Sequence, residues 1–195
     1  MEIMTVCTGN ICRSPLAELI IATRLADVGA TVHSGGVRGL NSAPMTPEAA
    51  HLAIHYGVPQ AAADAHRSRY LTEAMLASPD LILTMTRDHR RDVAELAPGR
   101  LRSTFTVREF ARLAANTPDD QIAAAAAAAG DDPGARLRAA AAHLASLRGL
   151  ILAPADPAED DVVDPYRQPW EVYITSAEQL LPALDQVERV ARLAA

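Results

Sequence analysis

The chain has 195 residues, of which 49% are hydrophobic and 22% are charged, and its formal net charge is −6. That length is enough for one domain with a sizeable core. The negative charge argues against a nucleic-acid or anionic-membrane surface, no apolar run could span a bilayer, and two cysteines cannot form a disulfide framework. The segment EIMTVC lacks the basic flank of a signal peptide. We therefore expect a soluble, cytoplasmic protein with no nucleic-acid or membrane partner, while its oligomeric state stays open.

Short apolar runs alternate with segments of helical period along the chain. The expected strands cover residues 3–7, 31–34, 80–86 and 103–107, and the expected helices cover 15–28, 47–57, 73–77 and 87–96, with another from 108. Thr46 and Thr72 are predicted N-caps, and Gly29 is expected to end the first helix. Strands that alternate with helices predict an α/β fold with a parallel sheet.

The segment 117–160 differs in composition from the rest of the chain. It predicts two alanine-rich helices, and because these lack large apolar side chains we expect them to pack weakly as a peripheral insertion. An acidic loop follows, and Thr175 with Glu178 forms a capping-box pattern that predicts the start of the last helix. The chain is thus expected to form a single domain over 1–195 with a helical insertion at about 117–160.

The stretch CTGNICRSP follows the first expected strand and combines residues suited to binding an oxyanion. Backbone N–H groups of a strand-to-helix loop can surround a phosphate, and Gly9 and Asn10 tolerate the tight backbone that such loops need. Pro15 suits the first turn of a helix, whose positive end then faces the loop. Arg13 offers a planar fork to two phosphate oxygens, and this positive field favours the nucleophilic thiolate of Cys7. The alternative is that both cysteines are small buried hydrophobes.

CTGNICRSP also resembles the signature C-x-G-N-x-C-R-S-P of the low-molecular-weight protein tyrosine phosphatases. The resemblance extends to DAHRSRYLT at 64–72, DLILTMTRDH at 80–89 and DPY at 164–166. It implies a flavodoxin-like, three-layer α/β fold whose four-stranded parallel sheet has the order 2-1-3-4, with the site at the carboxyl end of the first strand. It also implies a cysteine-dependent phosphatase that hydrolyses phosphotyrosine or similar phosphomonoesters, in proteins or small molecules, through a phosphocysteine intermediate and without a cofactor.

The resemblance implies a role for each matching position. Cys7 would attack phosphorus, Arg13 would hold the phosphoryl oxygens, and Asp164 would act as general acid and then as general base. His66 would support the loop by bracing Asn10. The positions expected to bind substrate are Thr8, Gly9, Asn10, Ile11, Cys12, Ser14 and Tyr166, and the Ser14 hydroxyl would also hydrogen-bond the thiolate.

Cys12 has two possible roles. The resemblance implies that it can close a disulfide with Cys7 under peroxide, and the alternative is an ordinary packed thiol. The two cysteines lie in one tight loop without a second pair of ligands, so a zinc site is not expected. The histidines predicted to take no part are His33, His51, His55, His89 and His143.

The walls of the expected pocket depart from the family pattern. Where family members usually carry an aromatic residue after the second strand, this chain offers Val37, Arg38 and Leu40. Arg167 replaces a second aromatic that often follows the Asp-Pro-Tyr, so Tyr166 is left as one wall. These changes weaken the case for phosphotyrosine in particular, and the arginines could favour an acidic peptide or another anionic phosphoester.

Two other functions remain open at this point. An arsenate reductase shares the fold and the loop, but it generally uses further cysteines downstream, and none follows Cys12. A phosphate-binding module without turnover is a different class of protein. It would be expected to lose Cys7 or Asp164, and the chain has both.

Overall fold

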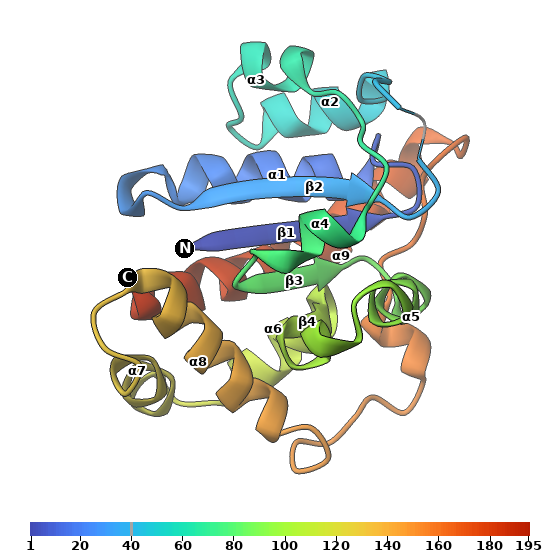
Figure 1. The fold of residues 1–195 in the computed structure, drawn as a ribbon. Coiled ribbons are helices and arrows are strands. Elements are labelled where there is room, and N and C mark those ends of the chain that lie inside the picture. Colours follow the sequence, from blue (N-terminus) through green and yellow to red (C-terminus); the bar gives the residue numbers. More distant parts are fainter. Residues whose placement is uncertain (40) are drawn as a thin grey trace.

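The computed structural model describes residues 1–39 and 41–195, so Leu40, a predicted pocket wall, lies outside the described residues. Four parallel strands form one sheet in the order β2-β1-β3-β4, which confirms the predicted fold class (Figure 1). The strands are β1 (Glu2–Cys7), β2 (Thr31–Gly36), β3 (Leu81–Thr84) and β4 (Thr104–Thr106). The helices are α1 (Arg13–Arg24), α2 (Pro47–His55), α3 (Gln60–Ala65), α4 (Glu73–Ala77), α5 (Arg87–Leu96), α6 (Val107–Ala115), α7 (Asp119–Ala127), α8 (Pro133–Ser146) and α9 (Trp170–Ala194).

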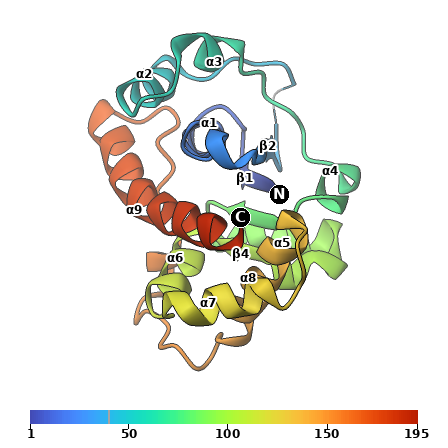
Figure 2. The same cartoon turned by 90° about the vertical axis from the view of Figure 1, so that its left-hand side faces the viewer.

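Helices cover both faces of the sheet because every central strand is apolar on both sides. Side chains such as Ile3 and Leu83 pack into a large core with α1, α6 and α9, whereas the alternating Met4 and Ile82 pack into a smaller core with α4 and α5. Figure 2 shows these helices on opposite sides of the sheet. The result is the expected three-layer arrangement.

Several helix ends follow from single residues. The side chains of Thr46, Thr86 and Thr106 accept hydrogen bonds from the first turns of α2, α5 and α6, so the predicted Thr46 cap is confirmed. Thr72 is the N-cap residue of α4 as predicted, but its side chain makes no capping hydrogen bond to the helix. The first helix is shorter than predicted: α1 ends at Arg24, and a short 3-10 turn over Ala26–Val28 separates it from Gly29, whose φ is 67°.

The capping-box prediction for the last helix is wrong. The helix α9 begins at Trp170, and Thr175 lies inside it, where its hydroxyl donates to the Glu171 carbonyl at 2.9 Å. A threonine that bonds back to the preceding turn cannot also cap a helix. The short helix α3 was not predicted, since its sequence QAAADA carries no amphipathic pattern. Among the helices of the described residues, none joins the length and the apolar character that crossing a membrane requires.

The expectation that the alanine-rich helices pack weakly is also wrong. Ile122 and Ala126 of α7, and Leu137 and Leu144 of α8, are fully buried in the large core. Both helices contact α9, and α8 also contacts α6. Alanine lets helix backbones approach closely, so a few large side chains per helix are enough to anchor the pair.

Candidate active site

The topology brings Cys7 to the point where the chain leaves the centre of the sheet. β1 lies between β2 and β3, and Cys7 is its last residue, paired with Gly36 at the end of β2. A side chain at Gly36 would come within 2.7 Å of the Thr8 carbonyl oxygen, so only glycine lets the loop after β1 lie this close. The loop leads directly into α1, which begins at Arg13. Ligands bind at such switch points in parallel sheets.

The thiol of Cys7 is surrounded by hydrogen-bond donors. Its Sγ lies 3.0 Å from the Ser14 hydroxyl oxygen, and the backbone N–H of Asn10 donates to it at 3.3 Å. Asn10 adopts a φ of 55°, which is the left-handed conformation predicted from the sequence. Both groups can donate a hydrogen bond to the sulfur, so the loop holds the Cys7 side chain in a fixed position.

Asn10 braces the loop through its side chain and its carbonyl. Its Nδ2 donates to the hydroxyls of Ser14, at 2.9 Å, and Ser34, at 2.6 Å, while its Oδ1 accepts from the Arg69 backbone N–H at 2.8 Å. The predicted contact with His66 is present, with Nε2 lying 2.9 Å from the Asn10 carbonyl oxygen. Because the Ser14 hydroxyl accepts from Asn10, its own hydrogen can point at Cys7 at 3.0 Å or at the more distant Gly35 carbonyl oxygen at 3.4 Å.

Two further supports of the loop were missed by sequence reasoning. The Ser34 hydroxyl donates to Glu18, and the same Glu18 oxygen lies 3.8 Å from the His66 Nδ1. Ser34 lies on β2 and Glu18 on α1, so the carboxylate ties together two groups that both contact Asn10. Only the three-dimensional register of β2 against α1 joins these positions, and no local pattern marks them.

Arg13 lies buried beneath the loop with its guanidinium only partly satisfied. Its side chain is 4% exposed; one Nη donates to the Val162 carbonyl at 2.9 Å, and the other lies 2.6 Å from a carboxylate oxygen of Asp164. Its Nε has no partner among the described residues. A buried, unsatisfied N–H of a charged group is costly unless an anion completes it, so this atom points to an oxyanion site.

Asp164 comes from the far end of the chain yet meets the loop at Arg13. Its other carboxylate oxygen accepts from the Tyr166 backbone N–H at 3.1 Å, and this turn fixes the Asp-Pro-Tyr segment over the site. Asp164 is 49% exposed, so it faces the solvent side of the loop while Cys7 lies beneath. The structure therefore brings together the three predicted catalytic residues.

His89 was predicted to take no part, yet it contacts the loop between β1 and α1 through Thr8. Its Nε2 lies 2.9 Å from the Thr8 hydroxyl and its Nδ1 lies 2.9 Å from the Thr86 hydroxyl. Burial, followed by the nearby Arg13 charge, lowers the pKa of His89 to about 4, so the ring is neutral near pH 7. The available signal was its position just after β3, at the edge of the sheet that holds Cys7.

Cys12 is chemically unlike Cys7 although it lies in the same loop. It is buried, with its sulfur 3.5 Å from the Thr46 hydroxyl and 3.8 Å from the Tyr173 hydroxyl. Burial raises the pKa of Cys12 to about 11, so this thiol stays protonated near neutral pH. Both cysteines are free.

A cavity of about 330 Å³ opens above the loop. Its lining residues are Cys7, Thr8, Gly9, Ile11, Cys12, Arg13, Arg38, Asp164, Tyr166 and Arg167. Tyr166 forms one wall, and the Arg167 guanidinium lies 5.1 Å from its ring centre. Within residues 1–39 and 41–195, no cluster of three or more His, Cys, Asp or Glu side chains could hold a metal ion.

Fold and site together define a class of α/β protein with a cysteine–arginine oxyanion loop after the first strand. The family model described as low molecular weight phosphotyrosine protein phosphatase matches residues 2–121, so the chain belongs to that family. The part of the chain that matches the family model ends before Asp164, and the fold brings that residue to the site. Among solved structures, the low molecular weight protein tyrosine phosphatase from T. tengcongensis has a TM-score of 0.65 at 28% identity, covering 96% of this chain and 97% of that one.

Three curated relatives each match between 50% and 60% of the chain. Etp of Escherichia coli, a low molecular weight protein-tyrosine-phosphatase, is 43% identical over 97 residues, which is 50% of this chain and 62% of Etp. The probable phosphatase EpsP of Ralstonia nicotianae is 31% identical over 116 residues, covering 60% of this chain and 77% of EpsP. A protein-arginine-phosphatase of Bacillus subtilis is 38% identical over 120 residues, covering 56% of this chain and 72% of that protein.

Proposed function

We propose that this protein is a cysteine-dependent phosphatase that hydrolyses phosphotyrosine or similar phosphomonoesters through a phosphocysteine intermediate. The observation that most supports this is Arg13: its buried Nε has no partner within the described part of the chain, while its neighbouring Nη meets Asp164. Such an arrangement offers an anion two parallel N–H groups once the carboxylate moves aside. The thiol of Cys7 lies in the same cavity.

In the first step a phosphoryl group occupies the loop. Its oxygens accept from Arg13 and from the loop N–H groups, and the Cys7 thiolate attacks phosphorus in line with the leaving oxygen. The S–P bond forms as the P–O bond breaks, and Asp164 gives its proton to the leaving oxygen. Asp164 pairs with Arg13 in the structure, so an incoming anion takes the carboxylate's place on the guanidinium.

In the second step a water molecule attacks the phosphocysteine. Asp164, now a carboxylate, accepts a proton from that water, and the S–P bond breaks to release inorganic phosphate. The departing thiolate is stabilised by the Ser14 hydroxyl and the Asn10 N–H, which already contact the sulfur. The hydrogen bond from Asn10 to Ser14 orients that hydroxyl as the donor.

The pocket supports a planar phosphorylated group without requiring one. Ile11 and Tyr166 supply apolar surface, and Arg38 and Arg167 place positive charge at the rim. A second candidate substrate is phosphoarginine, because a protein-arginine-phosphatase is 38% identical over 120 residues. The same steps apply, with nitrogen in place of oxygen as the leaving atom.

The organisation of the chain and its location belong to the same proposal. We take residues 1–195 as one phosphatase domain, to which the α7–α8 segment within about 117–160 is an addition, since the family match ends at 121. Both cysteines are free thiols, and one of them is the proposed nucleophile. This supports a location in a reducing compartment such as the cytoplasm.

The test is a steady-state assay of an aryl phosphate, a phosphotyrosine peptide, a phosphoserine peptide and a phosphoarginine peptide, from mildly acidic to neutral pH. We expect hydrolysis of the aryl phosphate and of the phosphotyrosine peptide, and no activity in Cys7→Ser. Hydrolysis of none of the four substrates would refute the phosphatase function. Activity that survives Cys7→Ser would refute the mechanism, and a strong preference for phosphoarginine would change the substrate class.

A further inference from the structure

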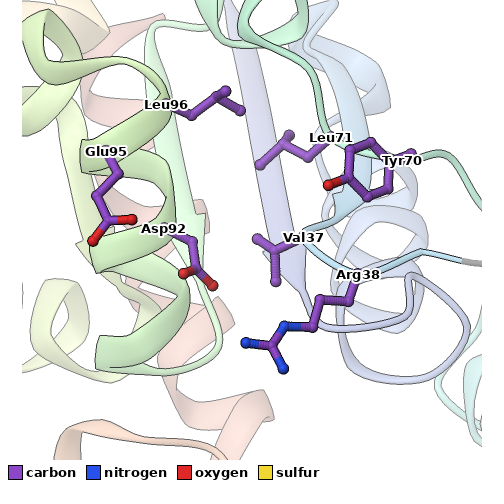
Figure 3. A pocket seen from close by; sticks show the side chains of 7 residues that line it. All are labelled: Val37, Arg38, Tyr70, Leu71, Asp92, Glu95 and Leu96. Atoms are coloured by element: carbon purple, nitrogen blue, oxygen red, sulfur yellow. The ribbon is translucent and has the colours of Figure 1, made fainter.

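A second cavity, of about 340 Å³, lies beside the proposed active site between α5 and the segments that follow β2 and precede α4. Figure 3 shows Leu96 of α5 on one side and Val37 and Leu71 on the other. Tyr70 stands at the rim, 52% exposed, with its ring beside Leu71. These side chains give the cavity an apolar floor and one aromatic wall. We call it the flanking pocket.

Two carboxylates complete the flanking pocket. Asp92 and Glu95 lie one turn apart on α5, and Asp92 points toward Val37 and Arg38 across the gap (Figure 3). Neither carboxylate forms an ion pair with any residue that the structure describes. By contrast, Asp88 on the same helix is paired with Arg91 at 3.2 Å. Negative charge beside a hollow apolar surface is complementary to a long cationic side chain.

The flanking pocket is continuous with the catalytic loop. Val37, Arg38 and Asp92 line it and also line a neighbouring cavity of about 420 Å³ that reaches Thr8 and Arg13. A peptide whose phosphorylated residue sits in the loop therefore has a continuous path to Asp92. Along this path the charge changes sign, from the arginines that surround the phosphate to the carboxylates of α5.

We propose that the flanking pocket binds an arginine side chain of a protein substrate, close in sequence to the phosphorylated residue. This inference rests on the proposed phosphatase function. The guanidinium would pair with Asp92 and Glu95 and stack on the Tyr70 ring, while its methylene groups cover Val37 and Leu71. An acidic side chain would meet like charge there, and an apolar one would bury carboxylates without a partner. The rim arginines alone suggested an acidic peptide; the flanking pocket reverses that expectation on the α5 side.

The test uses phosphotyrosine peptides that carry arginine or its uncharged near-isostere citrulline at each position flanking the phosphotyrosine. Two readouts are kept apart: kcat/KM of the wild-type protein, and binding to Cys7→Ser followed by fluorescence anisotropy. For at least one position we expect the arginine peptide to be favoured about three- to tenfold in both, as for a partly exposed pair of charges. The double variant Asp92→Asn/Glu95→Gln should lose this preference and hydrolyse an aryl phosphate as the wild type does.

A matched control separates local recognition from the general attraction of a negatively charged protein for a cationic peptide. Asp120→Asn/Glu178→Gln makes the same chemical changes at two exposed positions outside the cavities, and it should keep the preference. Equal behaviour of the two peptides, or a preference that survives in the α5 double variant, would overturn the inference. If the wild type hydrolysed nothing while Cys7→Ser still bound the arginine peptide better, the phosphatase function would fail and the flanking pocket would stand.

Discussion

The loop between β1 and α1 and the α7–α8 pair are held in place by different means. In the loop, buried polar side chains such as Asn10 and Ser14 are each fixed by directed hydrogen bonds. The α7–α8 pair is held by apolar contact, with Leu137 and Leu144 fully buried against the large core. Directed hydrogen bonds hold reactive groups in position, whereas the burial of apolar side chains stabilises the folded state. Substitutions in the two regions should therefore have separable effects.

The largest effect is expected at the general acid, where chemistry should change and folding should not. Asp164→Asn removes the proton donor, so hydrolysis of esters with poor leaving groups should slow by about 10²- to 10⁴-fold. Esters with good leaving groups need less protonation and should slow far less. The measurement is kcat/KM across a series of aryl phosphates. Equal slowing of all of them would mean that another group is the acid.

A core truncation in α8 should do the opposite. Leu144→Ala removes a side chain that is 0% exposed, and we expect a loss of roughly 2–5 kcal/mol of unfolding free energy. Leu150→Ala, at a leucine that is 79% exposed, is the matched control and should cost little. Denaturant unfolding gives the stabilities, and kcat/KM of the folded protein should stay within about twofold of wild type. A large loss of activity in folded Leu144→Ala protein would break the separation.

His89 should link stability to pH from within the loop region. Its pKa is lowered to about 4 by burial, so the unfolded chain binds a proton between pH 6.5 and 4 that the folded chain does not. Stability is therefore full above about pH 6.5 and falls as the pH drops toward 4, by roughly 2–3 kcal/mol from this group alone.

Denaturant unfolding from pH 7 to 4 measures that loss. His89→Gln can keep the contact with Thr8 but does not titrate. Its free energy of unfolding should therefore fall by roughly 2–3 kcal/mol less than that of the wild type over this pH range. His55→Gln, at an exposed histidine, should behave as wild type does. Parallel curves for wild type and His89→Gln would show that His89 is not held neutral.

The smallest effect separates the two thiols of the loop. After peroxide converts Cys7 to a sulfenic acid, attack by the Cys12 thiolate would form the S–S bond and break the S–O bond, and the departing hydroxide would take a proton from solvent to become water. Because burial raises the pKa of Cys12 to about 11, the rate of this step should rise about tenfold per pH unit between pH 7 and 9. The readout, after excess peroxide, is activity recovered with a dithiol, and Cys12→Ser should recover none, because its Cys7 sulfenic acid is oxidised further to the irreversible sulfinic acid. A rate that does not change with pH would contradict this.

The strands and the loop after β1 could be predicted from sequence because each depends on local residue types, whereas the order of the strands was implied only by the family resemblance. Alternating apolar runs marked the strands, and the requirements of phosphate binding left few choices for residues such as Gly9 and Arg13. Even the contact between His66 and Asn10 was predicted through the family resemblance, and it is present.

The remaining features depend on long-range packing. Glu18 and His89 join the site only through the placement of neighbouring strands and helices. Thr175 matched a capping pattern but bonds to the preceding turn of α9 instead. Weak packing of the α7–α8 pair is expected from its average hydrophobicity, but that average does not show how closely two alanine-rich helix faces can approach each other. The flanking pocket has no signature in the chain, because Tyr70 and Asp92 come from separate elements.

The proposed reaction passes through a phosphoryl group bonded covalently to Cys7, and this intermediate can be measured directly. Asp164→Asn protein should be mixed with an aryl phosphate of good leaving ability, stopped by rapid denaturation and digested for mass analysis. Without the Asp164 carboxylate as base, hydrolysis of the intermediate slows. We therefore expect a phosphoryl group on the peptide that contains Cys7. Phenolate release without any phosphorylated peptide, or a phosphoryl group on another residue, would contradict it.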